Sequence, residues 1–183
     1  MTLRYDVKAD VREVERALRG MKNGTATVVT RASNKAIRKA QTAAVRGIAK
    51  ELPGIRQKRI RSAMSLKLAR RTDWTASVSA RGARIPIIDL AARQTQRGVT
   101  YRTQDGRRLI PGAFIATMSS GHRGAYKRVG RHRLPIVELY GPSIPRVFVQ
   151  ERVERPMDQA AREEWAREAL RQIELLRTQQ GLR

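Results

Sequence analysis

Apolar residues recur at intervals of three and four over a long stretch of the first third of the chain. This spacing predicts a helix that begins near Thr25 and ends near Leu52, where Pro53 and Gly54 stop it. Most side chains on its apolar face are small, so another backbone can approach the helix closely. The face consists of Val29, Ala36, Ile37, Ala40, Ala44 and Ile48.

Two shorter elements are predicted before this helix. Weak alternation of apolar and polar residues from Thr2 to Lys8 predicts a strand. A short helix follows, and a capping box formed by Asp10 and Glu13 is expected to begin it. Gly24 is expected to end it in the left-handed conformation. Its apolar positions are Val11, Val14, Leu18 and Met21.

The period changes from helical to strand-like after a short basic helix, which is predicted over Ile55–Ala63. Ser65–Ala69 and Trp74–Ser79 alternate on either side of a turn, which indicates a hairpin. Ile85–Leu90 is apolar but contains Pro86, so an edge segment or a short helix is expected there. Further strands are predicted over residues 99–103, 113–118, 125–129 and 134–140, the second of them buried.

The last quarter of the chain returns to helical spacing. Gly141-Pro142-Ser143-Ile144-Pro145 is expected to form a stiff corner in which Ser143 caps the following turn. Pro156 is expected to break the chain before a final helix over residues 157–179, in which Glu163 pairs with Arg167. The apolar stripe of this helix is Met157, Ala161, Trp165, Ala169, Ile173 and Leu176.

Together these elements predict an α+β fold with N-terminal helices, a central, mostly antiparallel β-sheet and a long C-terminal helix. The 183 residues suit a single domain. Its expected parts are a helical part over 1–54, a β-rich core over 55–145 and a C-terminal helical part over 146–183. Because only 4% of the residues are aromatic, the core is expected to be thin and its burial to be completed by a partner or by further copies.

The charge of the chain is strongly positive and unevenly distributed. The formal net charge is +23, and the whole excess lies in residues 1–134, because residues 135–183 are neutral overall. Such an excess attracts nucleic acid, anionic membranes or acidic protein surfaces. Arginine outnumbers lysine 31 to 8, which suits bidentate pairing with phosphate or carboxylate and is equally what a GC-rich genome encodes. Both explanations stay open.

The polar side of the helix predicted over 25–52 is the candidate interaction surface. Because an ideal helix has about 3.6 residues per turn, its basic residues fall within about a third of the helix circumference. Such a stripe is either a solvated face or a surface that faces DNA or a protein partner, and both interpretations stay open. The candidate residues for contact with DNA or a partner are Arg31, Lys35, Arg38, Arg46 and Lys50, with Lys39 beside them.

The sequence contains no pattern typical of a catalytic, cofactor or metal site. It has no cysteine and no glycine-rich phosphate loop, and both histidines, His122 and His132, are expected to be exposed loop residues. The acidic residues of the central part are isolated from one another in the sequence, which leaves no pair for acid–base catalysis. They are Asp73, Asp89, Asp105 and Glu138. No catalytic residue, cofactor or metal is therefore expected, and the chain is not expected to be an enzyme.

No apolar stretch approaches the roughly 18 residues that a membrane span needs. The N-terminal residues also lack the apolar core of a secretory signal. A protein made in the cytoplasm, without a membrane partner, is therefore expected.

Three quoted segments carry a resemblance to a known family. The first is Gly112-Ala113-Phe114-Ile115-Ala116, and the second is Gly121-His122-Arg123-Gly124. The third begins with Leu134-Pro135-Ile136-Val137-Glu138 and ends at Pro145. A basic helix, a Leu-Pro-Gly break and a basic segment over Ile55–Arg61 precede them in the same order. Over roughly residues 25–155 the chain resembles the minor tail protein Z family of long-tailed bacteriophages.

This resemblance implies a virion protein at the head-proximal end of the tail, which completes the tail and joins it to the head. It also implies a homo-oligomeric ring around the DNA channel, with other tail and neck proteins as partners and non-specific contact with the DNA. The motif residues are expected to form turns and a sheet core, or to contact DNA or a partner directly. They are Gly112, Phe114, Gly121, Gly124, Pro135, Glu138, Gly141, Pro142, Ser143 and Pro145.

A second hypothesis is a free, basic nucleic-acid-binding protein. It accounts for the charge of +23 but not for the thin core or for the order of the motifs. No zinc finger and no strand with paired aromatic residues is present to read a sequence, so such binding would be non-specific and sensitive to salt.

Overall fold

The computed structural model describes residues 2–7, 12–18 and 24–179. Contacts within the chain divide it into two compact units, and the division falls inside the long helix α2 (Gly24–Glu51). The helical unit comprises Thr2–Ala44, Met64–Ala80 and Val149–Arg183, and the strand-rich unit comprises Val45–Ala63 and Arg81–Phe148. The single domain expected from the length stays a prediction.

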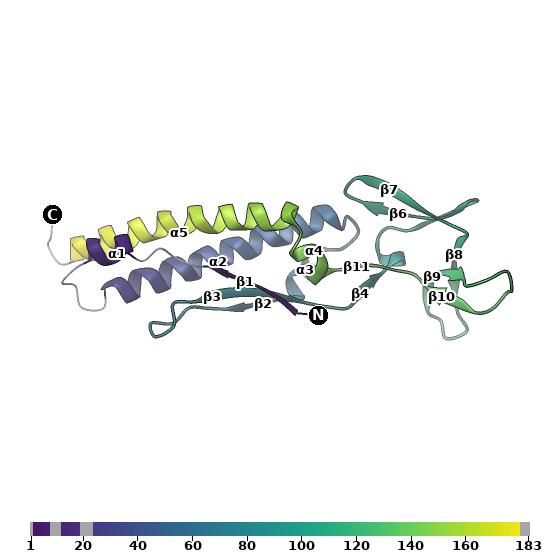
Figure 1. Ribbon diagram of the computed structural model, residues 1–183, viewed down its shortest axis with the longest axis horizontal. Coiled ribbons are helices and arrows are strands. Elements are labelled where there is room, and N and C mark those ends of the chain that lie inside the picture. The colour runs from purple at the N-terminus through teal and green to yellow at the C-terminus, as the bar shows by residue number, and fades with distance from the viewer. Residues whose placement is uncertain (1, 8–11, 19–23, 180–183) are drawn as a thin grey trace. The chain divides into compact units, whose positions relative to one another are not determined.

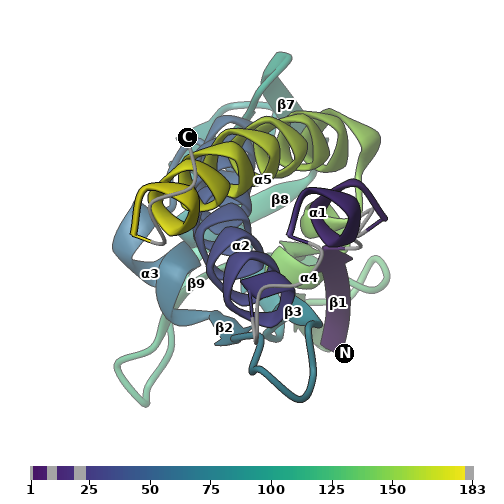
Figure 2. The same ribbon diagram turned by 90° about the vertical axis from the view of Figure 1, so that its left-hand side faces the viewer.

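The helical unit combines two long helices with a small sheet. Helix α2 lies between helix α5 (Glu151–Gln179) and a sheet in the order β1-β3-β2 (Figures 1 and 2). The strands are β1 (Thr2–Val7), β2 (Met64–Lys67) and β3 (Ala76–Arg81), and the short helix is α1 (Arg12–Ala17). The predicted first strand, the long helix and the hairpin are therefore confirmed.

The core of the helical unit is built from small and branched side chains, as the helical spacing predicts. All six residues of the predicted apolar face of α2 are fully buried. Trp165, Ile173 and Leu176 of α5 pack against the end of the core formed by α1 and the start of α2. Because Val29 and Ala169 meet in this core, the predicted stripes of α2 and α5 are confirmed as facing surfaces.

Three local predictions in the helical unit are wrong. Gly24 does not end a helix but begins α2. Pro156 lies inside α5, where the burial of Val153 and Met157 on either side of it offsets the hydrogen bond that proline cannot donate. Arg167 pairs with Glu164 rather than Glu163, since Glu164 lies one residue closer on the same helix face.

The predicted capping box cannot be compared with the structure in the same way. Asp10 lies outside the described residues, and the backbone of Glu13 falls within α1.

The strand-rich unit begins with the end of α2 and the short helix α3 (Gln57–Ser62), which confirms the predicted basic helix. Strand β4 (Arg84–Pro86) leads into a 3-10 turn, η1 (Ile87–Asp89), so the apolar segment around Pro86 is both edge strand and short helix. Strand β11 (Tyr140–Ser143) pairs with β4, and helix α4 (Ile144–Phe148) follows it. The largest fully buried side chains of this unit are Val45, Ile48, Ile60, Leu90, Val99, Val147 and Phe148.

Two three-stranded antiparallel sheets complete this unit (Figure 1). The first contains β5 (Arg93–Thr95), β6 (Gly98–Thr103) and β7 (Gly106–Pro111). The second contains β8 (Ala113–Thr117), β9 (Arg123–Arg128) and β10 (Ile136–Glu138) in the order β10-β9-β8.

The structure confirms the α+β class but replaces one central sheet with several small ones. The strand predicted over 134–140 is divided at Leu139, whose N–H donates to Ala125 O at 2.8 Å while its carbonyl accepts from Ile87 N at 2.9 Å. Leu139 therefore bonds to β9 on one side and to η1 on the other, and it separates β10 from β11. The strand over 113–118 is half-buried instead of buried, because only Ala113 is enclosed.

The predicted corner is partly a strand. Residues 141–143 extend β11, and the helical turn of α4 starts at Ile144. Ser143 Oγ accepts from Arg146 N at 3.3 Å, which confirms its predicted role as a cap, and the buried Pro145 lies in the first turn.

Candidate functional site

The predicted basic face of α2 is divided between residues that bind α5 and residues that stay exposed. Arg31 Nη1 donates to Gln172 Oε1 at 2.7 Å. Lys35 Nζ lies 2.7 Å from Glu168 Oε2 and 3.4 Å from Glu164 Oε1. These two cations therefore hold the two long helices of the helical unit together.

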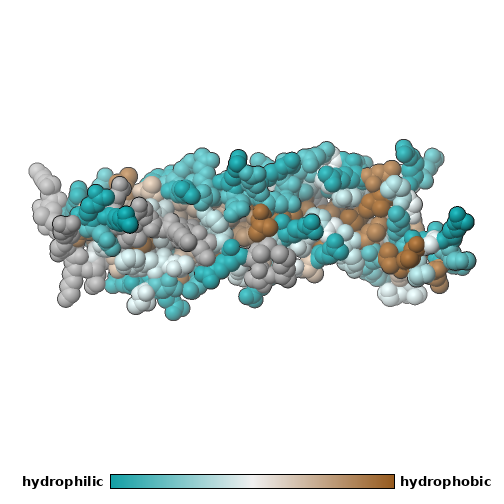
Figure 3. Space-filling view, viewed as in Figure 1, coloured by the Kyte–Doolittle hydropathy of each residue, from teal (hydrophilic) through white to brown (hydrophobic). Residues whose placement is uncertain are grey.

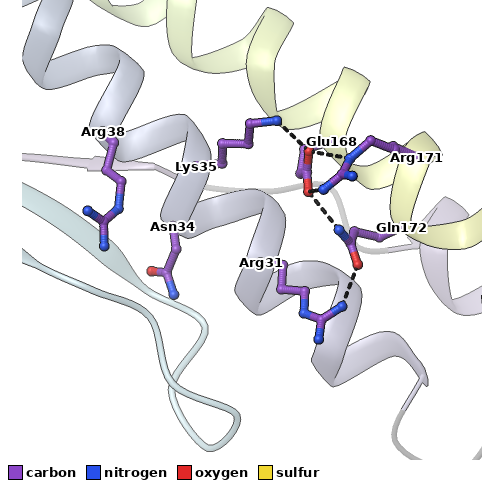
Figure 4. Close-up of a pocket in the computed structure, with 7 residues that line it drawn as sticks. All are labelled: Arg31, Asn34, Lys35, Arg38, Glu168, Arg171 and Gln172. Carbon is purple, nitrogen blue, oxygen red and sulfur yellow. Dashed lines mark hydrogen bonds and ion pairs between the residues drawn. The ribbon is translucent and has the colours of Figure 1, made fainter. Parts of the chain in front are cut away.

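Glu168 is the centre of this network (Figure 4). Its side chain is only 4% exposed, yet it accepts from Arg171 Nε and Nη2 at 2.9 and 2.6 Å and from Gln172 Nε2 at 2.7 Å, in addition to Lys35. Hydrogen bonds from Arg171 in particular, with those from Lys35, lower the pKa of Glu168 to about 2. The same contact with Glu168 raises the pKa of Lys35.

An open cavity of about 420 Å³ adjoins this network, and Arg38 and Asn34 line it together with the residues of the network (Figure 4). Asn34 is committed elsewhere, since its amide group donates to Ala69 O at 3.1 Å and accepts from Ala69 N at 2.7 Å. Two of the cations that line this cavity, Lys35 and Arg171, are already paired with the carboxylate of Glu168, and Arg31 donates to Gln172. The arrangement therefore suits structural cross-linking of two helices better than capture of an anion.

The other three candidate cations of α2 are exposed. In the part of the chain that the structure describes, Arg38, Arg46 and Lys50 make no ion pair. Lys50 lines a second open cavity, of about 330 Å³, together with Pro53 and Arg102 in the strand-rich unit.

A polar cluster in the strand-rich unit was not anticipated from the sequence. His122 Nε2 lies 2.9 Å from Glu138 Oε1, and Tyr140 Oη donates to Glu138 Oε2 at 2.7 Å. These two hydrogen bonds, that of Tyr140 first, lower the pKa of Glu138. A Cβ on Gly124 would lie 2.9 Å from both Glu138 Oε1 and the Tyr126 ring, so a larger residue at this position would force these side chains to shift.

Two expectations are therefore corrected. Glu138 is not isolated, and His122, although exposed, has a carboxylate partner. The signal lies in the strand register: β10 places Glu138 opposite Tyr126 of β9, beside the position of Gly124. Sequence spacing alone does not reveal this register because a basic loop separates the two strands. His132 is exposed, as predicted.

The remaining acidic residues of the central part are also engaged. Asp73 lies 2.9 Å from Lys67 Nζ and accepts from Thr75 N at 3.0 Å, and these bonds lower its pKa to about 2. Asp89 lies 2.8 Å from Arg59 Nη1. Among the described residues, no three His, Cys, Asp or Glu side chains come together as a metal site, and no helix is long and apolar enough to cross a membrane.

The motif residues mainly shape the backbone of the strand-rich unit. Gly112 and Gly121 have positive φ angles of 69° and 81°, which favour glycine. Phe114 is half-buried, with the guanidinium of Arg128 5.0 Å from its ring centroid and the Tyr126 ring at 6.2 Å. A Cβ on Gly141 would lie 2.7 Å from a methyl group of Leu90. Pro135 is exposed and Pro142 is half-buried.

Comparison with known proteins identifies a family. A family model described as Prophage minor tail protein Z (GPZ) matches residues 11–179. No curated protein and no solved structure matches the chain significantly.

Proposed function

The chain belongs to the prophage minor tail protein Z family, which makes it a structural component of a phage tail, and we propose that it completes the head-proximal end of that tail. In this proposal several copies form a ring around the DNA channel and join the tail to the head through other tail and neck proteins. The observation that carries the proposal is the family match, because it extends over residues 11–179 and so includes both compact units.

Exposed apolar side chains support contacts with further subunits. Leu170 on α5 and Leu134 beside β10 are 64% and 67% exposed, and Val129 is 64% exposed. The space-filling view shows a mostly hydrophilic face on which hydrophobic residues gather over strands β6 to β10 (Figure 3). Large apolar residues that gather on a surface are typical of protein interfaces.

The proposal assigns no catalytic role to the chain, in keeping with the structural role of the family. The purified protein should show no hydrolase, transferase or nuclease activity. A metal-dependent nuclease activity that co-purifies with the protein and disappears when Asp73, Asp89, Asp105 or Glu138 is replaced would contradict it.

The predicted basic face of α2 remains the proposed surface toward DNA or an acidic neighbouring ring. It comprises Arg31, Lys35, Arg38, Arg46 and Lys50, of which the first two also bind α5. Reversing the charge of the other three should impair attachment of tails to heads without unfolding the helical unit. The attraction should also weaken with salt, because the Debye length falls from about 10 Å at 0.1 M to about 3 Å at 1 M.

Deletion of the gene from the phage that encodes this chain tests the proposed function directly. Negative-stain images should show full heads and separate tails, and supplying the protein in trans should restore joined particles. Joined, infectious particles at normal yield without the protein would overturn the proposal. The charge-reversed variant is compared in the same assay with a control in which the exposed Arg70, Arg71 and Arg177 are reversed.

The alternative is a free nucleic-acid-binding protein, and the net charge of +23 is its support. Size-exclusion chromatography with light scattering, followed by imaging of virions, separates the two. A tail component is found in particles and forms a defined oligomer, whereas a free binder stays outside the virion.

A further inference from the structure

The densest positive charge of the chain lies between Arg93 and Arg133. This segment has ten basic residues and a single acidic one, Asp105. It forms β5 to β9 and the loop after β9 of the strand-rich unit. Part of the charge is structural, since Arg107 donates to Ala91 O and to Thr100, and Arg128 stacks on Phe114. Other basic side chains of this described segment, among them Arg93 and Arg123, make no such contact within the chain.

Two of these arginines share an open cavity of about 460 Å³ within the strand-rich unit. Strands β5, β8 and β9 provide its walls, and no lining residue is acidic. In the described part of the chain, neither Arg93 nor Arg123 forms an ion pair or a side-chain hydrogen bond, and both are exposed. The lining residues are Ala92, Arg93, Gln94, Ile115, Ala116, Thr117 and Arg123.

Backbone pairing fixes the positions of these residues. Thr117 and Arg123 are opposite each other in the β8–β9 register, so the hydroxyl and the guanidinium belong to one face of the sheet. Gln94 Oε1 accepts from Ile115 N at 2.7 Å, which ties β5 to β8, while Gln94 Nε2 donates to Thr95 O at 3.0 Å. The cavity therefore has a hydrogen-bonded floor, and its two charged groups are attached to strands rather than to a loop tip.

The contrast with the cavity beside α2 is informative. There Glu168 forms ion pairs with Lys35 and Arg171, whereas here two arginines and a hydroxyl lie together without a carboxylate. Guanidinium groups bind phosphate oxygens through paired N–H donors, and a hydroxyl adds a third donor. The chemistry of the donor set is that of an anion site.

We propose that Arg93 and Arg123 bind backbone phosphates of duplex DNA in this cavity. The inference rests on the proposed function, since it specifies where the subunit would contact the DNA of the channel. Duplex DNA is favoured over an acidic protein because the centres of protein interfaces are depleted of charge, whereas the lining of this cavity presents two arginines and no carboxylate. DNA presents one charge per about 1.7 Å of its axis, which suits many cations spread over one surface.

The test measures equilibrium binding of the full-length protein to a fluorescein-labelled 30-base-pair duplex. Fluorescence anisotropy is the readout, and the measurement is repeated over a range of salt concentrations. Each phosphate contact contributes about 0.9 to the slope of log affinity against log salt. The double variant Arg93→Gln, Arg123→Gln should make that negative slope shallower by about 1.8. It should also weaken binding at 0.1 M salt by tens of fold. Lysine at both positions should restore the slope because it restores the charge.

The matched control replaces Arg70 and Arg71 with Gln, which removes the same charge from exposed positions of the helical unit. It should leave the slope close to that of the unchanged protein. Circular dichroism confirms that all variants are folded.

Equal slopes for the cavity variant and its control would overturn the assignment. So would loss of binding to polyglutamate without any change in DNA binding, which would identify an acidic protein as the partner. These outcomes concern the purified protein and DNA, so they are independent of whether the deletion phage assembles joined particles.

Discussion

Replacing Glu168 with Gln should destabilise the helical unit in a manner that depends on pH. The substitution keeps the size of the side chain but removes the charge that Lys35, Arg171 and Gln172 surround at 2.6–2.9 Å. The amide nitrogen of the new side chain would also meet donors where the carboxylate met them as an acceptor. Buried acceptors that lose their donors, and donors that lose acceptors, are costly.

The expected loss can be estimated from the pKa of Glu168. A fall in the pKa of Glu168 from its ordinary value of 4.5 to about 2 corresponds to ~3 kcal/mol of stabilisation when the carboxylate is ionised. The side chains of Lys35 and Arg171 are 49% and 57% exposed, so solvent screens part of this interaction. We therefore expect Glu168→Gln to lower the free energy of unfolding by about 1–2 kcal/mol at pH 7.

The sign of the pH dependence follows from the lowered pKa. Glu168 binds its proton more tightly in the unfolded chain, so its stabilisation is fully present above about pH 4.5 and is lost as the pH falls toward 2. The variant has no carboxylate at this position, so it has no such stabilisation to lose as the pH falls. The difference in unfolding free energy between the two proteins should therefore shrink from about 1–2 kcal/mol at pH 7 to near zero at pH 2.

Tryptophan fluorescence during urea unfolding is the suitable assay. Both tryptophans, Trp74 and Trp165, lie in the helical unit, and Trp165 Nε1 donates to Ser33 Oγ of α2 at 3.3 Å. The signal therefore reports the unit that contains Glu168. Glu163→Gln on the same helix is the control. Glu163 is exposed, and among the described residues its carboxylate accepts only from Gln159, so its replacement should cost less than about 0.5 kcal/mol. Equal stability of Glu168→Gln and Glu163→Gln at pH 7, or a difference that persists unchanged at pH 2, would refute the reasoning.

Three further predictions concern other surfaces. Gly124→Ala should destabilise the protein by about 1–3 kcal/mol, because the new Cβ would lie 2.9 Å from Glu138 and Tyr126. The loss is measured as a lower thermal midpoint, followed by circular dichroism. Gly130→Ala is the control and should be neutral, because its Cβ would meet nothing within 4 Å. Leu170→Glu should reduce self-association in light scattering while leaving the helical unit folded, since this side chain is 64% exposed; an unchanged oligomer would remove Leu170 from the interface. Replacing Pro142 and Pro145 together with Ala should lower stability or incorporation into particles, because each fixes a φ angle where β11 passes into α4, and unchanged values of both would show the corner to be dispensable.

Helices were the best predicted part of the fold. The spacing of apolar residues along α2 and α5 is local information, and every residue of the predicted α2 face is buried. The break predicted at Pro156 was wrong. The cost of a proline in a helix is local information, whereas the burial of Val153 and Met157 that offsets this cost depends on tertiary packing. Tertiary contacts override local propensity in such cases.

Strands were located well but their pairing was not. Single residues such as Leu139, which hydrogen-bonds to strand β9 and to the turn η1, leave no mark on the alternation of apolar and polar residues. The same limit applies to the candidate site. The basic residues of α2 are recognisable from the sequence, but the ion pair of Lys35 depends on Glu168, which is 133 positions away. Likewise Arg93 and Arg123 come together only through the folding of β5, β8 and β9.

The helical unit is discontinuous in the sequence, and this has a consequence for synthesis on the ribosome. Its core joins Val28, Val29 and Ala32 near the start of the chain to Ala169 near the end, with the whole strand-rich unit encoded between them. Domains generally fold in order as the chain emerges, at about 5–20 residues per second. The strand-rich unit is therefore complete while α2 still lacks its partner helix, so a chain that stops before α5 keeps an exposed apolar helix face. We therefore expect truncation before α5 to leave a chain that aggregates instead of one that folds.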